Sequence, residues 1–148
     1  MRSPVRLVAL CMLAGCSNAP LARTLTASSP SPAPDVFQCA RDQLKAIRFD
    51  QSSIDLDARR LTARRYDEKA RRPDVQFRRV VDRLEIEAVP AAESGVTRLE
   101  VTARTFGEYT TQRGPTENEE KTSETALSAA ETILQKCSQP VDSLSVPG

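Results

Sequence analysis

The sequence predicts an α+β domain at residues 35–139, a two-layer sandwich in the order helix, four antiparallel strands, helix (αββββα). Apolar residues recur at helical spacing near both ends of this range, and apolar and polar residues alternate between residues 80 and 106. A helix with one apolar stripe and a sheet with one apolar face each bury that surface against another element. Both helices are therefore expected on one face of the sheet.

The first helix is predicted to begin at residue 35 and to run for about three turns. Asp35 is a good N-cap, and Gln38 follows three residues later in a box-like arrangement. One face of the helix carries the apolar stripe Phe37, Ala40, Leu44 and Ile47. Cys39 lies on the flank of this stripe.

Four strands are predicted between the helices, at residues 48–54, 60–66, 80–89 and 96–106. The third and fourth alternate most regularly, and in the third Leu84 and Ile86 face one side while glutamates face the other. Such alternation predicts an antiparallel sheet with one face in water. A charged loop is predicted at 67–74 and a second loop at 107–115.

The second helix is predicted from a capping box formed by Thr116 and Glu119, with regular helix beginning as late as Thr122. Its apolar face consists of Ala126, Leu127, Ala130, Ile133, Leu134 and Cys137. Pro140 ends the helix, because proline cannot continue it. Residues 140–148 are expected to form a flexible tail.

Residues 1–15 have the three parts of an export signal: two arginines, a short apolar run and two small residues. The apolar run at 7–13 is far shorter than the ~20 residues needed to span a bilayer. The tetrad Leu13-Ala14-Gly15-Cys16 resembles the lipobox of bacterial lipoproteins. An ordinary secretory signal, in which Cys16 has no role, is the alternative.

The lipobox resemblance implies a location for the protein. It implies cleavage before Cys16 and a lipid on the Cys16 sulfur that anchors the chain in a membrane. Ser17 replaces the Asp that holds many such proteins at the inner membrane, which implies the outer membrane with the domain in the periplasm. Residues 16–34 end in a Ser/Pro-rich run and are predicted to be a tether with a reach of roughly 50 Å.

Composition argues against several classes of activity. The chain has no histidine, so it contains neither a Ser-His-Asp triad nor a Cys-His pair nor a histidine ligand for zinc. Composition leaves a Ser-Lys or paired-carboxylate enzyme open, and an envelope hydrolase is the third hypothesis. Since no motif indicates catalysis, a metal or a cofactor, the protein is predicted not to be an enzyme. Cleavage before Cys16 leaves 19 basic against 20 acidic residues, which argues against general nucleic-acid binding.

Two cysteines remain once Cys16 carries a lipid, and each lies on a predicted helix. A Cys39–Cys137 disulfide is predicted, since the envelope is an oxidising compartment. It would close a loop of about 100 residues and contribute roughly 4–5 kcal/mol in the chain-entropy model. It requires the two Cα atoms to lie within about 7 Å. Two buried free thiols are the alternative.

Charge is segregated along the chain. Residues 59–83 contain ten basic and four acidic side chains, and residues 84–131 contain ten acidic and four basic ones. One interpretation is a basic surface for an anionic partner, such as lipopolysaccharide, a phospholipid headgroup or an acidic protein. The other is cross-strand pairing on the wet face, in which Arg60 and Arg64 offset Glu85, Glu87 and Glu100.

Pairing within the sheet explains the charged loop least well, because the loop leaves the sheet. Arg71 and Arg72 of this loop are therefore candidates for contact with a partner. Phe106 falls on the polar side of its strand, and Tyr109 lies beyond the predicted end of that strand. One interpretation is a contact site formed by an aromatic edge beside a basic loop. The other is that these aromatic side chains cover the rim of the core.

The predicted helix-strand-strand opening at residues 35–66 resembles in outline the helix-grip domains of the accessory lipoprotein of the outer-membrane barrel-assembly machinery, and it implies the same fold class. We therefore expect a non-enzymatic, lipid-anchored envelope protein that acts through contacts with an envelope protein. The alternative is a periplasmic module that binds lipid, lipopolysaccharide or peptidoglycan. A closed helix–sheet interface favours the first, and an open groove favours the second.

Overall fold

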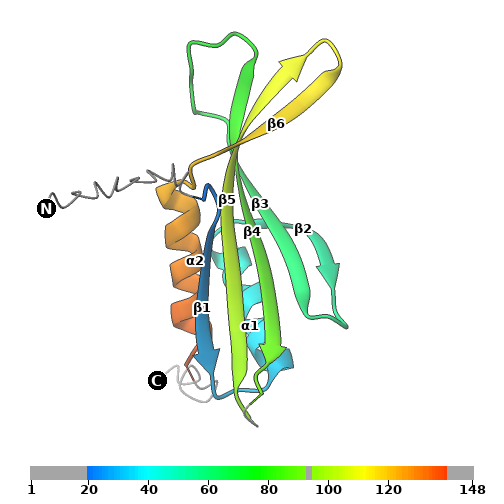
Figure 1. The fold of residues 1–148 in the computed structure, drawn as a ribbon, viewed down its shortest axis with the longest axis vertical. Helices are drawn as coiled ribbons and strands as arrows, with labels where there is room; N and C mark the ends of the chain where they lie inside the picture. Colours follow the sequence, from blue (N-terminus) through cyan, green and yellow to red (C-terminus); the bar gives the residue numbers. More distant parts are fainter. Residues whose placement is uncertain (1–19, 93–94, 140–148) are drawn as a thin grey trace, which may run out of the picture.

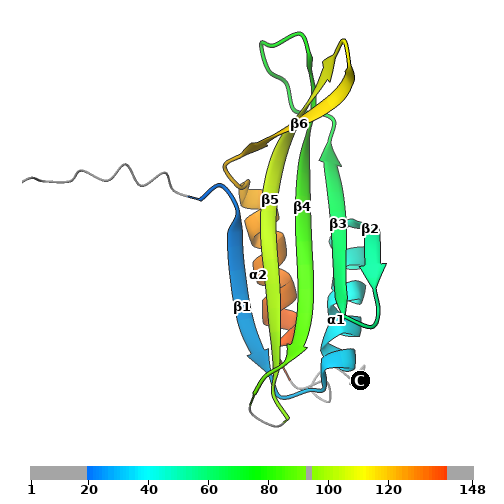
Figure 2. The same cartoon turned by 45° about the vertical axis from the view of Figure 1, so that its right-hand side comes forward.

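The computed structural model describes residues 20–92 and 95–139 as an α+β domain with one antiparallel sheet and two helices. Both helices lie on the same face of the sheet (Figures 1 and 2), in agreement with the predicted class and layering. The sheet has six strands rather than the predicted four. Cys16 and the rest of the lipobox, as well as the predicted C-terminal tail, lie outside the described residues.

The six strands are β1 (Arg23–Ser29), β2 (Asp50–Asp55), β3 (Arg60–Asp67), β4 (Phe77–Pro90), β5 (Thr97–Thr111) and β6 (Gly114–Glu120), and the helices are α1 (Ala33–Ala46) and α2 (Glu124–Cys137). The sheet order is β1-β5-β4-β3-β2. Strand β6 also pairs with β5, beyond the end of β1. The long strand β5 therefore has two partners, one after the other, along a single edge.

The predicted tether at 16–34 is wrong over much of its length, and the domain begins before residue 35. Residues 23–29 form β1, which pairs with residues 97–103 of β5. Leu25, Ala27 and Ser29 alternate with exposed residues along β1, as in a half-buried strand. The prolines that suggested an extended tether start only at Pro30.

Both helix starts differ from the predictions. Helix α1 starts at Ala33 after Pro32, and the predicted N-cap Asp35 lies in its first turn. There its negative charge is attracted to the positive end of the helix dipole. Helix α2 is capped by Ser123, whose Oγ accepts a hydrogen bond from the Ala126 amide at 3.0 Å. The residues of the predicted capping box lie instead in β6, because β5 continues through the predicted loop at 107–115 and pairs there with β6.

The interface between the helices and the sheet is closed. Seven of its aliphatic side chains are at most 1% exposed and belong to one hydrophobic cluster: Leu44, Leu61, Leu84, Ile86, Leu99, Val101 and Ile133. Burying each such side chain contributes about 1.5–3 kcal/mol. These residues fill the space between the two layers. A separate hollow of about 390 Å³ is lined by Ile47, Phe49, Arg65 and residues of α2.

The Cys39–Cys137 disulfide predicted from the sequence is confirmed. It joins α1 to α2 across a sequence separation of 98 residues, with a Cα–Cα distance of 5.7 Å. The alternative of two free thiols is therefore excluded. The disulfide holds the two helices side by side over the sheet.

A buried carboxylate joins α2 to the sheet at the other end of that helix. Asp82 is 5% exposed, and its Oδ1 accepts hydrogen bonds from Thr105 Oγ1 and Ser123 Oγ, both at 2.7 Å. The Ser123 amide in turn donates to Thr105 Oγ1 at 2.9 Å. Three elements, β4, β5 and the start of α2, are thereby held together.

The sheet extends beyond the two helices at this end. Figure 1 shows the start of β4, the end of β5 and all of β6 rising past the N-terminal end of α2, together with the loop between β3 and β4. We call residues 67–79 and 106–120 the arm. No helix covers the arm in either view (Figures 1 and 2), so other interactions must stabilise it.

Candidate functional site

Arginines stacked on aromatic rings take the place of a hydrophobic core in and beside the arm. Three guanidinium carbons lie 4.0–4.6 Å from ring centroids, close enough for cation–π attraction. The three pairs are Arg72 with Phe77, Arg79 with Tyr66, and Arg83 with Phe106. Because the rings come from strands, each stack fixes an arginine against the sheet.

Arg72 connects the charged loop to the hairpin of β5 and β6. Its guanidinium donates to Tyr109 Oη at 3.0 Å and to both carboxylate oxygens of Glu120. The hydrogen bond with Glu120 raises the pKa of Arg72 above its ordinary value, although burial opposes this. Arg72 is therefore a permanent cation that clamps the loop by a two-pronged ion pair.

This clamp depends on the glycine beside it. A Cβ atom at Gly107 would lie 2.5 Å from Glu120 Oε1 and 2.9 Å from Tyr109 Cε2. Both distances are shorter than van der Waals contact. Only glycine leaves room for Glu120 and Tyr109 to meet Arg72 over the surface of β5.

Gly107→Ala is expected to loosen the loop at 68–76 without unfolding the domain. The added methyl group displaces Glu120 and Tyr109, so Arg72 loses two of its partners. The amide hydrogens of the loop should exchange faster, while the free energy of unfolding changes by less than about 1 kcal/mol. Hydrogen–deuterium exchange measures both effects. Thr116→Ala, at an exposed position in β6, is the control, and unchanged loop exchange in Gly107→Ala contradicts the prediction.

The opposite face of the sheet carries a second set of ion pairs. Arg79 pairs with Glu108 at 3.1 Å and with Glu68 at 3.2 Å, and Arg83 pairs with Glu117 at 2.7 Å. Burial lowers the pKa of Arg79, but its hydrogen bonds and charge interactions with Glu108 and Glu68, aided by Tyr66, outweigh burial and raise it. Arg79 is therefore held in place as a cation, and Arg83 is held by its ion pair with Glu117.

Many side chains of the basic segment at 59–83 form ion pairs with side chains of the acidic segment at 84–131 in the folded domain. Arg60 pairs with Glu87 at 2.8 Å, as the cross-strand interpretation predicts. Glu85 instead pairs with Arg104, at 3.4 Å. In the described part of the chain, Arg64 forms no ion pair with a glutamate. Pairing thus accounts for much of the basic segment, and the arginines left over are the candidates for a partner.

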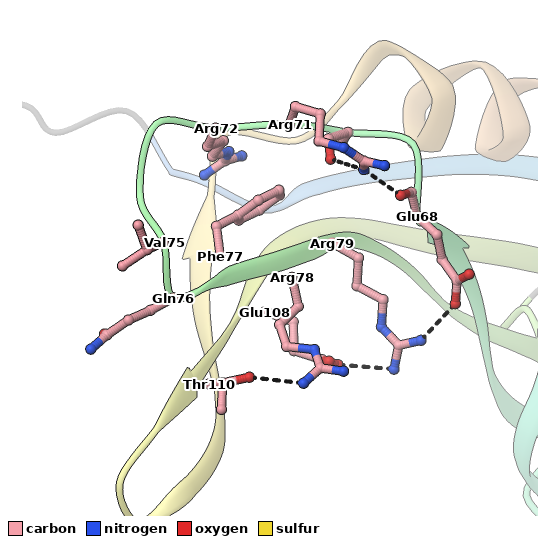
Figure 3. Close-up of a pocket in the computed structure, with 11 residues that line it drawn as sticks. Glu68, Arg71, Arg72, Val75, Gln76, Phe77, Arg78, Arg79, Glu108 and Thr110 are labelled. Atoms are coloured by element: carbon pink, nitrogen blue, oxygen red, sulfur yellow. Dashed lines mark hydrogen bonds and ion pairs between the residues drawn. The ribbon is translucent and has the colours of Figure 1, made fainter.

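Two of these remaining arginines line a pocket of about 750 Å³ under the charged loop. In Figure 3, Arg71 lies along the loop and Arg72 points from the loop toward Phe77, while Arg78 and Arg79 extend from the start of β4 on the side away from the loop, toward Thr110 and Glu108. Arg71 donates only to the backbone carbonyl oxygens of Glu68 and Ala70, and Arg78 donates to Thr110 Oγ1 at 3.1 Å.

Among the described residues, no carboxylate lies within ion-pair distance of Arg71 or Arg78. Each guanidinium has five N–H donors, so both retain donors for a ligand. Each of these two guanidinium groups of the pocket lining can therefore bind an anionic group, such as a carboxylate or a phosphate, by bidentate hydrogen bonds. We call this pocket the arginine pocket.

The four predicted contact residues do not form one site. Arg72 and Tyr109 are hydrogen-bonded, and Arg71 lines the pocket beside them. Phe106 and Tyr109 are an odd number of residues apart in one strand and so face opposite sides of the sheet. Phe106 lies beneath Arg83.

Sequence reasoning missed the residues that complete the site, which are Phe77, Arg78, Arg79, Glu108 and Glu120. An aromatic residue followed by two arginines stood directly after the charged loop and was the available signal. The role of these three residues could not be predicted, because their partners lie in the hairpin of β5 and β6, more than 25 residues farther along the chain.

Neither the known protein-family models nor the curated protein sequences include a match to this chain. Residues 20–92 and 95–139 contain no group of three or more His, Cys, Asp or Glu side chains that could hold a metal ion. Within the same residues, neither helix is long and apolar enough to cross a membrane. The fold and the site define a disulfide-linked α+β domain with an arginine-rich arm.

Proposed function

We propose that the chain is a non-enzymatic, lipid-anchored protein of the cell envelope that binds another envelope component through its arm. The observation that carries this proposal is the closed helix–sheet core, in which seven large aliphatic side chains are at most 1% exposed. A closed core leaves the surface as the place for binding. The lipobox-like tetrad ending at Cys16 supports the anchor and, with Ser17, the outer membrane.

The arm is the best candidate surface because it combines free donors with fixed geometry. Arg72 and Arg79 are held by glutamates, while Arg71 and Arg78 have no carboxylate partner in the described part of the chain. A hydrogen bond to a charged group contributes about 1.5–3 kcal/mol. A rigid frame lowers the entropy lost when such bonds form.

The leading candidate partner is an envelope protein that presents an acidic segment to the arginine pocket. A module that binds lipid, lipopolysaccharide or peptidoglycan is the second candidate. The pocket of about 750 Å³ supports this second candidate, because its lining is polar and its volume would accommodate a phosphate or carboxylate of such a ligand. Both candidates use the same arginines.

Two measurements test the proposal. Mass spectrometry of the mature protein should find Cys16 at the N-terminus with an attached lipid. A photo-crosslinking amino acid at Val75, which is 98% exposed in the arm, should give an adduct in cells, whereas one at Leu56, 63% exposed in the β2–β3 turn, should not. Arg71→Ala with Arg78→Ala should weaken the Val75 adduct. An unmodified N-terminus, or equal adducts at both positions, contradicts the proposal.

A further inference from the structure

The segment available to connect the predicted anchor to the domain is short. The Leu21 carbonyl oxygen accepts hydrogen bonds from the Thr122 amide at 3.3 Å and from Thr122 Oγ1 at 2.5 Å. Residue 21 is thus already fixed to the body of the domain. Only Ser17 to Pro20 separate it from Cys16, and this length of chain reaches about 17 Å when fully extended.

The point of attachment is the base of the arm. Thr122 lies between the end of β6 and the start of α2, and Figure 2 shows β1 beginning beside that junction. From Thr105 to Thr111, β5 rises about 20 Å above this level, at ~3.4 Å per residue. The reach of the connecting segment and the height of the arm are therefore nearly equal. A lipid on Cys16 would hold the membrane surface within reach of the tip of the arm.

The tip of the arm carries an excess of positive charge. Residues 67–79 and 108–117, which include the β6 residues paired with this part of β5, contain six basic and five acidic side chains. One of the acidic side chains, Glu117, is paired with Arg83 outside this set. Four of the basic side chains are exposed and form no ion pair with any described residue: Lys69, Arg71, Arg78 and Arg113. Two of the carboxylates, those of Asp67 and Asp74, accept hydrogen bonds from amides of their own turns.

A membrane surface with anionic lipids attracts such cations. Each Lys or Arg near that surface contributes about 1 kcal/mol. Two of these four cations, Arg71 and Arg78, line the arginine pocket and keep unused donors, which match the oxygen atoms of a phosphate. Val75, an apolar side chain that is 98% exposed, lies in the same loop.

We infer that the tip of the arm rests on the anionic headgroup layer of the membrane that holds the Cys16 lipid, with a lipid phosphate in the arginine pocket. This inference rests on the anchor in the proposed function and develops its second candidate, in which the arm binds lipid. It fixes the orientation of the domain. The β2–β3 turn, at the far end of the sheet from the arm (Figure 1), then points away from the membrane.

The test uses the acylated full-length protein in lipid vesicles. An environment-sensitive fluorophore is attached to Val75→Cys, or to Leu56→Cys as the matched position at the far end. Vesicles contain phosphatidylcholine alone or with phosphatidylglycerol. The emission from position 75 should shift to the blue and be quenched by a lipid-borne quencher when phosphatidylglycerol is present. Position 56 should show neither change.

Charge variants test the cations directly. Arg71→Ser, Arg78→Ser and Arg113→Ser should each weaken the phosphatidylglycerol-dependent signal by about fivefold at low salt. Arg98→Ser is the control, because Arg98 is exposed at the other end of β5. An identical signal in both vesicles, an equal signal at position 56, or a Val75 adduct with protein alone overturns the inference while leaving the proposed function intact. A mature N-terminus without lipid overturns both.

Discussion

Replacing Cys39 and Cys137 together with alanine is expected to lower the free energy of unfolding by about 3–4 kcal/mol. The disulfide closes a loop across 98 residues, so its removal frees nearly the whole domain in the unfolded state. A domain of this size has a total stability of about 5–15 kcal/mol. The loss is therefore a large fraction of what keeps the protein folded.

Urea denaturation followed by circular dichroism measures this effect. A reducing agent should destabilise the wild-type protein by a similar amount and leave the double variant unchanged. The single variants Cys39→Ala and Cys137→Ala should match the double variant, because either one breaks the bond. A loss below about 1 kcal/mol would show that the helices are held mainly by packing.

Asp82→Ala is expected to cost about 2–4 kcal/mol. The substitution removes the carboxylate oxygen that accepts hydrogen bonds from the hydroxyl groups of Thr105 and Ser123. It also removes the contact that orients Ser123, the N-cap of α2. Loss of an N-cap alone costs about 1 kcal/mol.

Asp82→Asn is the matched control, because its side-chain oxygen can still accept both hydrogen bonds. It should retain most of the stability that alanine loses. In a double-mutant cycle, Asp82→Ala and Ser123→Ala should cost less together than the sum of the two single losses. Additive costs, or an asparagine variant as unstable as the alanine variant, would contradict the role of the hydrogen-bond network.

The helices and the disulfide could be predicted because their signals are local. Apolar residues at helical spacing marked both helices, and their buried faces contain the predicted Phe37, Ala40, Leu44, Ile133 and Leu134. Each helix also carries one cysteine. Once the helices share a face of the sheet, a bond between those cysteines follows.

The strands β1 and β6 could not be predicted with the same reasoning. The composition of residues 16–34 masked β1, and every residue of β6 is at least partly exposed, so it shows no apolar alternation. Both strands exist because β5 is long enough to offer an edge to each of them. A partner strand, and not an amphipathic pattern, decides their conformation.

By itself, the sequence determined the α+β class, the two helices, the disulfide between them and the segregation of charge, because periodicity and composition are properties of neighbouring residues. Only the tertiary structure decided the extra strands, the arm and the arginine pocket. Arg72 meets its partners across 37 and 48 residues, and Leu21 meets Thr122 across 101. Which of the described arginines remain without an ion pair, and how close the predicted anchor lies to them, depends on such long-range contacts.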